Sequence, residues 1–351
     1  MARHAAPVAP GSQSVELRRL NHAVARSIRT LSGLGVLFVL APFVFHGEFQ
    51  ITFLTLALYV TLLGVAWNML GGFAGQYSFG HAIFFGVGAY AAALVQVQGG
   101  LNAWFGWVAG MCLGGLAGAA VGAVSFRYGL RGSYFALVTL AIAEVCRIIA
   151  NSISITGAGV GMMIPLQPGL AHLQFAGKLG YYYWILATVA VAFALSSWVR
   201  HSRYGAALAA VRDNEESARA LGIDATALKV MASALSGALM ASAGVFYLQY
   251  FHYIDPTLVF GPAVSVQALL AAIVGGLGSV LGPLIGAIAL AVLNEIGAHL
   301  FGGIPEFSMV LYGILLILIV RFMPHGLARG VAPLVGRLRG ASGRREDTAG
   351  A

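Results

Sequence analysis

Charged side chains gather between positions 200 and 224 of a chain that has only 20 basic and 12 acidic residues in 351. Eight of them fall in this segment: Arg200, Arg203, Arg212, Asp213, Glu215, Glu216, Arg219 and Asp224. Acids and bases at this density form ion pairs and charge-assisted hydrogen bonds, the chemistry by which a polar surface docks on a soluble partner. Long apolar stretches flank this segment, which we call the knob (residues 200–224).

The knob is predicted to fold as two short helices between Tyr204 and Gly222. Asp213 is placed to cap the second helix, with Glu216 three positions later, and Gly222 suits the C-terminal stop. Asp224 is placed to cap the apolar helix that follows. Four residues are expected to form an apolar side: Leu208, Val211, Ala218 and Leu221. A solvated loop is the alternative, but a loop needs neither caps nor amphipathic spacing.

Few polar residues interrupt the apolar stretches. Gln76, Ser78 and His81 follow a glycine-rich interruption, where they either line a cavity or cap and pack a helix start. Glu144 and Arg147 lie three positions apart on one helix face, where they either neutralise each other or form a gate. Two residues are interpreted as interhelical hydrogen-bonding groups in preference to transport groups: Asn68 and Glu295.

Motifs for catalysis are missing from the sequence. The two lysines, Lys178 and Lys229, complete no Gly-Lys-Ser/Thr phosphate loop, and no His-Glu-x-x-His zinc motif occurs. The two cysteines, Cys112 and Cys146, fall in apolar stretches and are interpreted as plain buried thiols. We therefore expect no enzyme activity, no bound cofactor and no metal in this chain, and any energy must come from a partner.

The composition indicates a membrane protein. The chain is 59% hydrophobic and 9% charged, whereas a soluble domain carries about 25% charged residues. Apolar segments recur along the chain, and a helix needs ~20 such residues to cross the hydrocarbon core. They lie near 31–46, 49–70, 82–98, 103–124, 133–150, 181–199, 226–250, 263–277, 280–300 and 307–323. The expected fold is an all-α polytopic membrane protein with about ten transmembrane or partly re-entrant helices.

Basic residues predict the orientation. Ten crossings place 18 of the 20 lysines and arginines on one side and leave Arg147 and Lys178 for the other. By the positive-inside rule, both termini and the knob are cytoplasmic. The net charge of +8 is therefore interpreted as a topology signal and not as nucleic-acid binding. The expected domains are a basic tail 1–28, a transmembrane domain 29–326 and a basic tail 327–351.

Glycines at regular spacing predict where helices pack. A row at every fourth position marks one face of a predicted helix: Gly106, Gly110, Gly114, Gly118 and Gly122. Small residues at this spacing let membrane helices approach closely, and a role in translocation is the minor alternative. A weak internal echo relates Gly71–Gly75 to Gly275–Gly278. Paired helix interruptions mark the pathway in many transporters, although a glycine-rich chain produces such likeness by chance equally well.

Four blocks occur in a fixed order: Gln76–Tyr90, Arg131–Glu144, Thr156–Pro165 and Tyr204–Ile223. Together they resemble branched-chain amino-acid ABC transporter permeases of the LivM type, over about residues 50–325. Ala158 stands where the family usually has glycine. The resemblance implies a multi-pass permease of the bacterial inner membrane. It would carry branched-chain amino acids, with urea, short amides and other amino acids as alternatives within the family.

The resemblance also implies partners and roles. The partners are a second related permease subunit, two cytosolic ATPase subunits that hold ATP and Mg²⁺, and a periplasmic substrate-binding protein. The ATPase would engage the knob through a set of coupling residues: Arg212, Asp213, Glu215, Glu216, Ala218 and Gly222. A second set is the candidate substrate pathway: Gln76, Ser78, His81, Tyr134 and Thr156.

Two other function classes compete with this interpretation. A secondary transporter or channel would need ionisable or ion-coordinating groups at the membrane midplane. An intramembrane enzyme would need a nucleophile with its base, or a metal constellation. The sequence shows only scattered single residues of these kinds. Co-purification with ATPase subunits would separate the three classes.

Overall fold

The computed structural model describes residues 32–45, 47–301 and scattered positions between 310 and 327. Within this part, seven helices are long and apolar enough to cross a membrane. They are Glu48–Phe73, Ala103–Arg127, Gly132–Ser152, Lys178–His201, Ala225–Phe251, Pro256–Gly275 and Gly282–His299. Two shorter apolar helices, Ser32–Val44 and His81–Val97, accompany them. The predicted polytopic helical architecture is therefore confirmed.

The predicted helix ends agree with the structure to within about three residues, but the count of about ten is not confirmed. The tenth predicted segment, 307–323, lies mostly outside the described residues, as do the predicted tails 1–28 and 327–351. The predicted short segment 263–277 is part of a longer unit. A further turn, Pro256–Phe260, precedes it, and the two together reach the length of a crossing.

The elements follow one another in a simple order. The helices are α2 (Glu48–Asn68), α3 (His81–Val97), α4 (Ala103–Arg127), α5 (Gly132–Ser152), α6 (Lys178–His201), α7 (Arg203–Asp213), α8 (Glu215–Ala220), α9 (Ala225–Phe251), α10 (Pro256–Phe260), α11 (Pro262–Gly275) and α12 (Gly282–Phe301). A π-helical turn, Met69–Phe73, extends α2. Two short strands, β1 (Met162–Met163) and β2 (Tyr253–Ile254), pair antiparallel.

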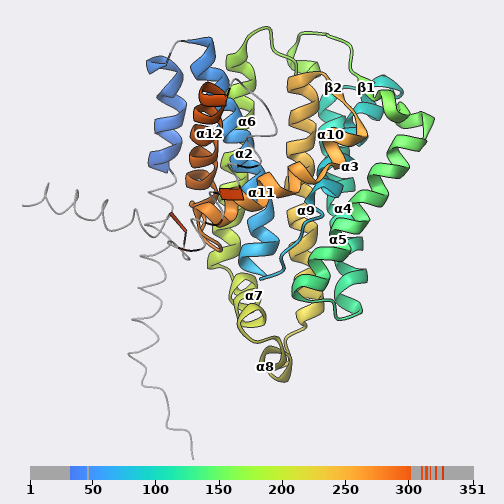
Figure 1. Ribbon diagram of the computed structural model, residues 1–351, viewed down its shortest axis with the longest axis vertical. Helices are drawn as coiled ribbons and strands as arrows, with labels where there is room; N and C mark the ends of the chain where they lie inside the picture. Colours follow the sequence, from blue (N-terminus) through green and yellow to red (C-terminus); the bar gives the residue numbers. More distant parts are fainter. Residues whose placement is uncertain are drawn as a thin grey trace, which may run out of the picture.

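The knob and the strands lie at opposite ends of the helix bundle. Figure 1 shows α7 and α8 projecting from one end, with β1 and β2 near the other. Met162 pairs with Ile254, so the sheet ties the loop after α5 to the end of α9. Three single-turn 3₁₀ helices lie in the same loop: Ser154–Thr156, Ala158–Val160 and Leu170–His172.

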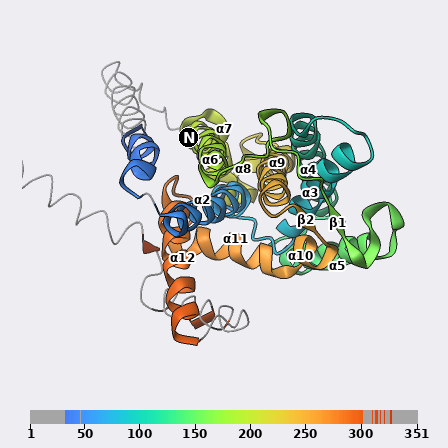
Figure 2. The same ribbon diagram turned by 90° about the horizontal axis from the view of Figure 1, so that it is seen from above.

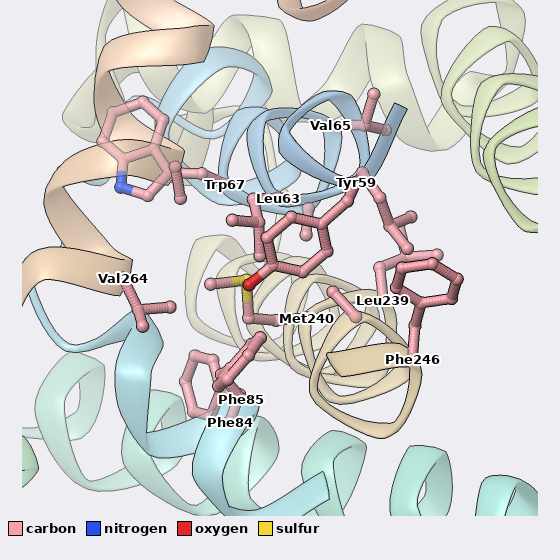
Figure 3. Packing of buried hydrophobic residues seen from close by; sticks show 14 of the residues in the cluster. Tyr59, Leu63, Val65, Trp67, Phe84, Phe85, Leu239, Met240, Phe246 and Val264 are labelled. Atoms are coloured by element: carbon pink, nitrogen blue, oxygen red, sulfur yellow. The ribbon is translucent and has the colours of Figure 1, made fainter. Parts of the chain in front are cut away.

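Aromatic side chains fill the centre, where α2, α3 and α9 meet. Tyr59 of α2 lies with its ring 6.4 Å from that of Phe85 and 6.0 Å from that of Phe246. Figure 3 shows these rings together with Met240, which is completely buried. Because aromatic pairs prefer such offset and edge-on arrangements, the centre has one preferred packing.

Helix α4 packs against α3 and α9 along the predicted glycine row, and the three helices cluster on one side of the bundle (Figure 2). All five glycines of the row are buried. A Cβ atom added at Gly118 would lie 2.3 Å from the carbonyl oxygen of Ser233 on α9, and one at Gly114 would lie 2.2 Å from the Cβ of Ala241. The Ser233 hydroxyl also donates a hydrogen bond of 2.7 Å to the Gly118 carbonyl. We call this contact the α4–α9 seam.

Candidate functional site: the knob and its attachment

The knob folds as two short helices, α7 and α8, each with a side-chain cap. The Ser202 hydroxyl accepts from Gly205 N at 3.1 Å, and the Asn214 side chain accepts from Ser217 N at 2.9 Å. The prediction that Asp213 caps the second helix is wrong, because this residue is still helical and its carboxylate pairs with Arg212. Asn214 has the extended backbone of a cap, with φ −156° and ψ 103°. Asp224 caps α9 through Ala227 N at 3.0 Å, as predicted.

The apolar side of the knob turns toward the bundle. Leu208, Val211 and Ala218 are buried, but Leu221 is 81% exposed, so its predicted place on this side is wrong. Leu221 is the C-cap residue of α8 and lies one position before Gly222, where the chain turns with φ +83°. This left-handed backbone is the conformation that favours glycine at a helix end. A Cβ at Gly222 would have open space around it, so the backbone and not crowding selects glycine there.

Glu215 joins the knob to two other parts of the molecule. One of its carboxylate oxygens accepts from Lys229 Nζ of α9 at 3.0 Å and from Arg219 Nη2 of α8 at 2.8 Å. The other oxygen lies 3.4 Å from Arg131 Nε, at the residue that precedes α5. The side chains of Glu215 and Lys229 are only 9% and 1% exposed. Three cations from three segments therefore meet at one carboxylate, which we call the Glu215 hub.

Electrostatics keep the Glu215 hub ionised. Burial raises the pKa of the Glu215 carboxyl, but the hydrogen bonds and charges of Lys229, Arg131 and Arg219 lower it more. The net result is a pKa below the ordinary value of 4.5. Lys229 Nζ also lies 4.8 Å from the ring centre of Phe126 at the end of α4, a cation–π contact. The hub is thus connected to α4, α5, α8 and α9.

Arg212 connects the knob to the two glycine-rich interruptions. Its Nη1 donates to the carbonyl of Gly72 at 3.2 Å, in the π-helical turn after α2. A Cβ at Gly278, between α11 and α12, would lie 3.4 Å from the same nitrogen. The Asn68 side chain joins the two interruptions, because it accepts from Gly278 N at 2.9 Å and donates to Ser279 O at 3.0 Å. The two segments of the predicted internal echo therefore contact each other.

Arg200 adds a further hydrogen bond to this region, from its Nη1 to the Gly278 carbonyl at 3.1 Å. Asn68 is the interhelical hydrogen-bonding group that the sequence predicts. Glu295, predicted to play the same role, instead lies 3.3 Å from His299 on its own helix. Two arginines from the knob region and one asparagine thus hold both interruptions at the knob end of the bundle.

The segment from Gln76 to His81 is buried between helices. His81 Nε2 lies 2.9 Å from the Ser236 hydroxyl of α9, which in turn donates to the Ala66 carbonyl of α2 at 2.7 Å. The Ser78 carbonyl accepts from Trp67 Nε1 at 2.8 Å. His81 is completely buried, and Gln76 is 9% exposed. These contacts favour the packed, hydrogen-bonded interpretation of His81.

The structure does not bring the five predicted pathway residues together. Gln76, Ser78 and His81 form one buried group. Tyr134, 72% exposed, lies in the first turn of α5 near the knob. Thr156 lies beyond the other end of α5, where its hydroxyl donates to the Ala150 carbonyl at 2.6 Å. The five residues lie at different depths along the bundle, so a substrate route that includes all of them would meet them one after another.

Helix α5 is the least covered of the candidate spans, with 22% of its apolar window buried. Glu144 and Arg147 lie on it and form the predicted intrahelical pair, with Arg147 Nε 2.9 Å from Glu144 Oε2. Their side chains are 49% and 29% exposed. With a rise of 1.5 Å per residue, they lie about 3 Å and about 8 Å from the middle of α5. An ion pair is therefore open to the surroundings at membrane depth.

The polar side chains described above connect helices through hydrogen bonds and ion pairs. Among the described residues, no three His, Cys, Asp or Glu side chains are grouped as metal ligands would be. The polar contacts join helices to each other and to the knob. The sequence did not single out Lys229, Arg131 or Ser236 for these roles. A signal was available for Lys229, which is one of two lysines in the chain and lies one turn into a helix after an acidic cap.

The chain matches the family model of branched-chain amino acid transport system permease components over residues 50–320. It is 30% identical over 343 residues to the high-affinity branched-chain amino acid transport system permease protein LivM of Escherichia coli K12, covering 89% of this chain and 77% of that protein. The LivM protein of Salmonella typhimurium LT2 is also 30% identical, over 85% of this chain and 74% of its own.

A second group of relatives is more distant. The permease protein LivH of Escherichia coli K12 is 25% identical over 289 residues, which are 78% of this chain and 92% of LivH. The ribose import permease protein RbsC of the same organism is 26% identical over 66% of this chain and 72% of its own length. No solved structure matches the chain.

Proposed function

This chain belongs to the family of branched-chain amino acid permease components, and from that premise we propose that it is the membrane-spanning subunit of an ATP-driven importer for branched-chain amino acids. The observation that carries the proposal is the Glu215 hub, where cations from α8, α9 and the start of α5 hold one carboxylate of the knob. A knob attached in this way passes a push to several membrane helices at once. The sequence has no phosphate loop, so ATP and Mg²⁺ belong to partner subunits.

A soluble ATPase is the partner proposed for the knob. Asp213 and Glu216 are both exposed on it, and Glu216 makes no ion pair with a described residue, so it can meet a cation of a docked protein. The knob end of the chain is rich in arginine, which supports a cytoplasmic position for the knob. The helix Ser32–Val44 runs away from the knob end, because it leads into α2 at Glu48, which pairs with Lys178 at the opposite end of the bundle. Both observations support a cytoplasmic N-terminus and two cytosolic ATPase subunits in the complete importer.

A second, related permease is the partner proposed for the open face of α5. A charged pair facing lipid at this depth costs several kcal/mol, so such groups face protein or a water-filled path. The exposed neighbours Leu137, Leu140 and Val145 are apolar, as a membrane-embedded contact surface requires. A permease of the same family would cover these residues and leave Glu144 and Arg147 beside the route of the substrate.

The end opposite the knob offers a surface for a periplasmic binding protein. Val160, Met163, Leu166 and Leu170 are between 71% and 81% exposed in the loop that follows α5. Apolar side chains exposed together in this way mark interaction surfaces. In the proposal, substrate enters from this end, and the push on the knob changes the tilt of α5 relative to the α4–α9 seam.

The chain of contacts from the knob to α5 is continuous. Arg131 joins α5 directly to the Glu215 hub. A second route runs from Arg212 to Gly72 and along the glycine-rich segment to Phe79, whose N–H donates to Thr139 Oγ1 of α5 at 3.2 Å. Two attachments at different heights turn a displacement of the knob into a tilt of α5.

The test is reconstitution of the chain in proteoliposomes with a related permease, ATPase subunits and a substrate-binding protein from the same genome. The expected result is uptake of labelled leucine that requires ATP and is lost with Glu216→Lys on the knob. The control, Glu48→Lys, reverses a charge that is also exposed but lies at the opposite end, paired with Lys178.

Uptake without the ATPase subunits would show a secondary transporter or channel and would overturn the proposal. Competition by urea or short amides, with no effect of leucine, would keep the importer and correct its substrate. Loss of uptake in both charge-reversal variants would remove the knob as the docking surface.

A further inference from the structure

A large apolar cavity lies on the outside of the bundle, between the helix Ser32–Val44, α6 and the start of α12. Its volume is about 660 Å³, within the range of sites that hold small organic ligands. Phe38, Leu186, Val189 and Phe193 are among the residues that form its walls. Most of its walls are hydrocarbon, so in a membrane an apolar chain fills this space more favourably than water does.

The length of the cavity fits one leaflet of the bilayer. Its lining on α6 runs from Leu186 to His201, which is about 22 Å at 1.5 Å per residue. One leaflet of the hydrocarbon core is about 15 Å thick, so the cavity extends from mid-membrane into the interface on the knob side. Trp198, 57% exposed, lines that end, and tryptophan is enriched at membrane interfaces.

The end of the cavity near the knob is polar and basic. His201 and Ser202 line it, and Arg203 follows directly in the chain. Arg203 is exposed and makes no ion pair or hydrogen bond with any described residue. Among the described residues that line the cavity, none is acidic. An apolar channel with a basic end between membrane helices is the arrangement that binds anionic lipid head groups.

We propose that this cavity binds one acyl chain of an anionic phospholipid, with the phosphate beside His201 and Arg203. The acyl chain fills the space between the helix Ser32–Val44 and α6, and the head group contacts the point where α6 becomes α7. A bound lipid of this kind would fix the base of the knob relative to the membrane. The inference stands on the cavity and its charges and does not depend on the identity of the transported substrate.

The test is mass spectrometry of the intact full-length chain released from nanodiscs that contain phosphatidylglycerol or phosphatidylcholine with the same acyl chains. We expect one retained phosphatidylglycerol and a much smaller fraction with phosphatidylcholine. Ala190→Phe fills the cavity and should reduce the retained lipid about ten-fold, since a side chain then occupies the ligand's volume. Val191→Phe, at the next position and outside the cavity lining, should retain it.

A second pair of variants tests the head group. Arg203→Gln should lower phosphatidylglycerol retention about five-fold, the ratio for the ~1 kcal/mol that one basic residue contributes near an anionic surface. Arg127→Gln, an exposed arginine at the end of α4, should not change it. Equal retention of the two lipids, or equal losses in the paired variants, would overturn the proposal. Lipid binding that appears only after deletion of residues 1–28 would show that the chain's own N-terminal segment is the occupant, which also overturns it.

Discussion

The α4–α9 seam and the attachment of the knob hold helices together by opposite means. At the seam, glycines bring two backbones so close that a Cβ at Gly118 would lie 2.3 Å from a carbonyl oxygen. At the attachment, a single carboxylate and two arginines reach across to other segments. Close packing has no intermediate position, because small displacements produce overlap. Side-chain ion pairs tolerate displacement, so the seam can serve as the fixed frame and the attachment as the moving joint.

Helix α5 is part of neither the α4–α9 seam nor the knob. It is the least covered candidate span, and it touches the knob through Arg131 and the glycine-rich segment through Thr139. A helix with few packing contacts and two polar attachments is the element that a moving knob displaces most easily. The comparison therefore supports our proposal that α5 is the element that moves against the seam.

The largest expected effect concerns the seam. Gly118→Ala should lower the free energy of unfolding by about 3 kcal/mol, because the new methyl group collides with the backbone of α9. Gly115→Ala is the matched control, since its Cβ would meet its nearest neighbours at an ordinary 3.5 Å. Unfolding of the purified chain in increasing denaturing detergent measures both. Equal stability of the two variants would contradict a seam held by close packing.

Next in size is the Glu215 hub. Glu215→Gln should cost about 2 kcal/mol, the contribution of a hydrogen bond to a charged group, because it leaves the buried Lys229 without a carboxylate partner. Adding Lys229→Met should recover most of that loss, since an apolar side chain replaces the unpaired charge. The same detergent unfolding assay tests this pair. If the double variant is as unstable as the single one, the charge pairing is not what holds α8 to α9.

Arg212→Ala should have a smaller effect on stability, about 1 kcal/mol, through loss of the hydrogen bond to the Gly72 carbonyl. Its main consequence should appear in the glycine-rich segment. Hydrogen exchange of the amides near Gly72 should speed up, whereas amides along the seam should not change. Faster exchange at both places would indicate general loosening and would remove the specific role of Arg212.

The smallest effect concerns pH. The pKa of Glu215 is lowered on folding, so its stabilisation is present above about pH 4.5 and is lost as the pH falls through the lowered value. The difference in melting temperature between the native chain and Glu215→Gln should therefore shrink as the pH falls below 4.5. A difference that stays constant down to the pH at which the native chain unfolds in acid would mean that the carboxylate charge contributes nothing.

Much of the fold could be predicted from sequence because membrane helices are long and apolar. The spans near α4, α6 and α9 follow directly from hydropathy, and the glycine row gives the packing face of α4. The two short helices of the knob follow from their polar and apolar pattern. The cap at Asn214 was missed because Asp213 and Asn214 are both good capping residues, and only the backbone conformation distinguishes them.

The candidate site was predicted less completely, for a physical reason. Glu215 was recognised within the knob, but its partners Lys229 and Arg131 come from segments 14 and 84 positions away in the sequence. Local spacing cannot reveal which distant side chains meet. Similarly, Asn68 and Gly278 become partners only when two helix interruptions pack together. Such tertiary contacts need the fold.

The most direct test of the account measures how tightly transport follows ATP hydrolysis. In proteoliposomes holding the complete importer, the Glu215→Gln, Lys229→Met double variant should hydrolyse ATP while importing about ten-fold less leucine for each ATP, because the push then reaches α5 only through Arg212 and the glycine-rich segment. The same ratio of leucine to ATP in the double variant and the native chain would contradict the claim that the Glu215 hub transmits the motion.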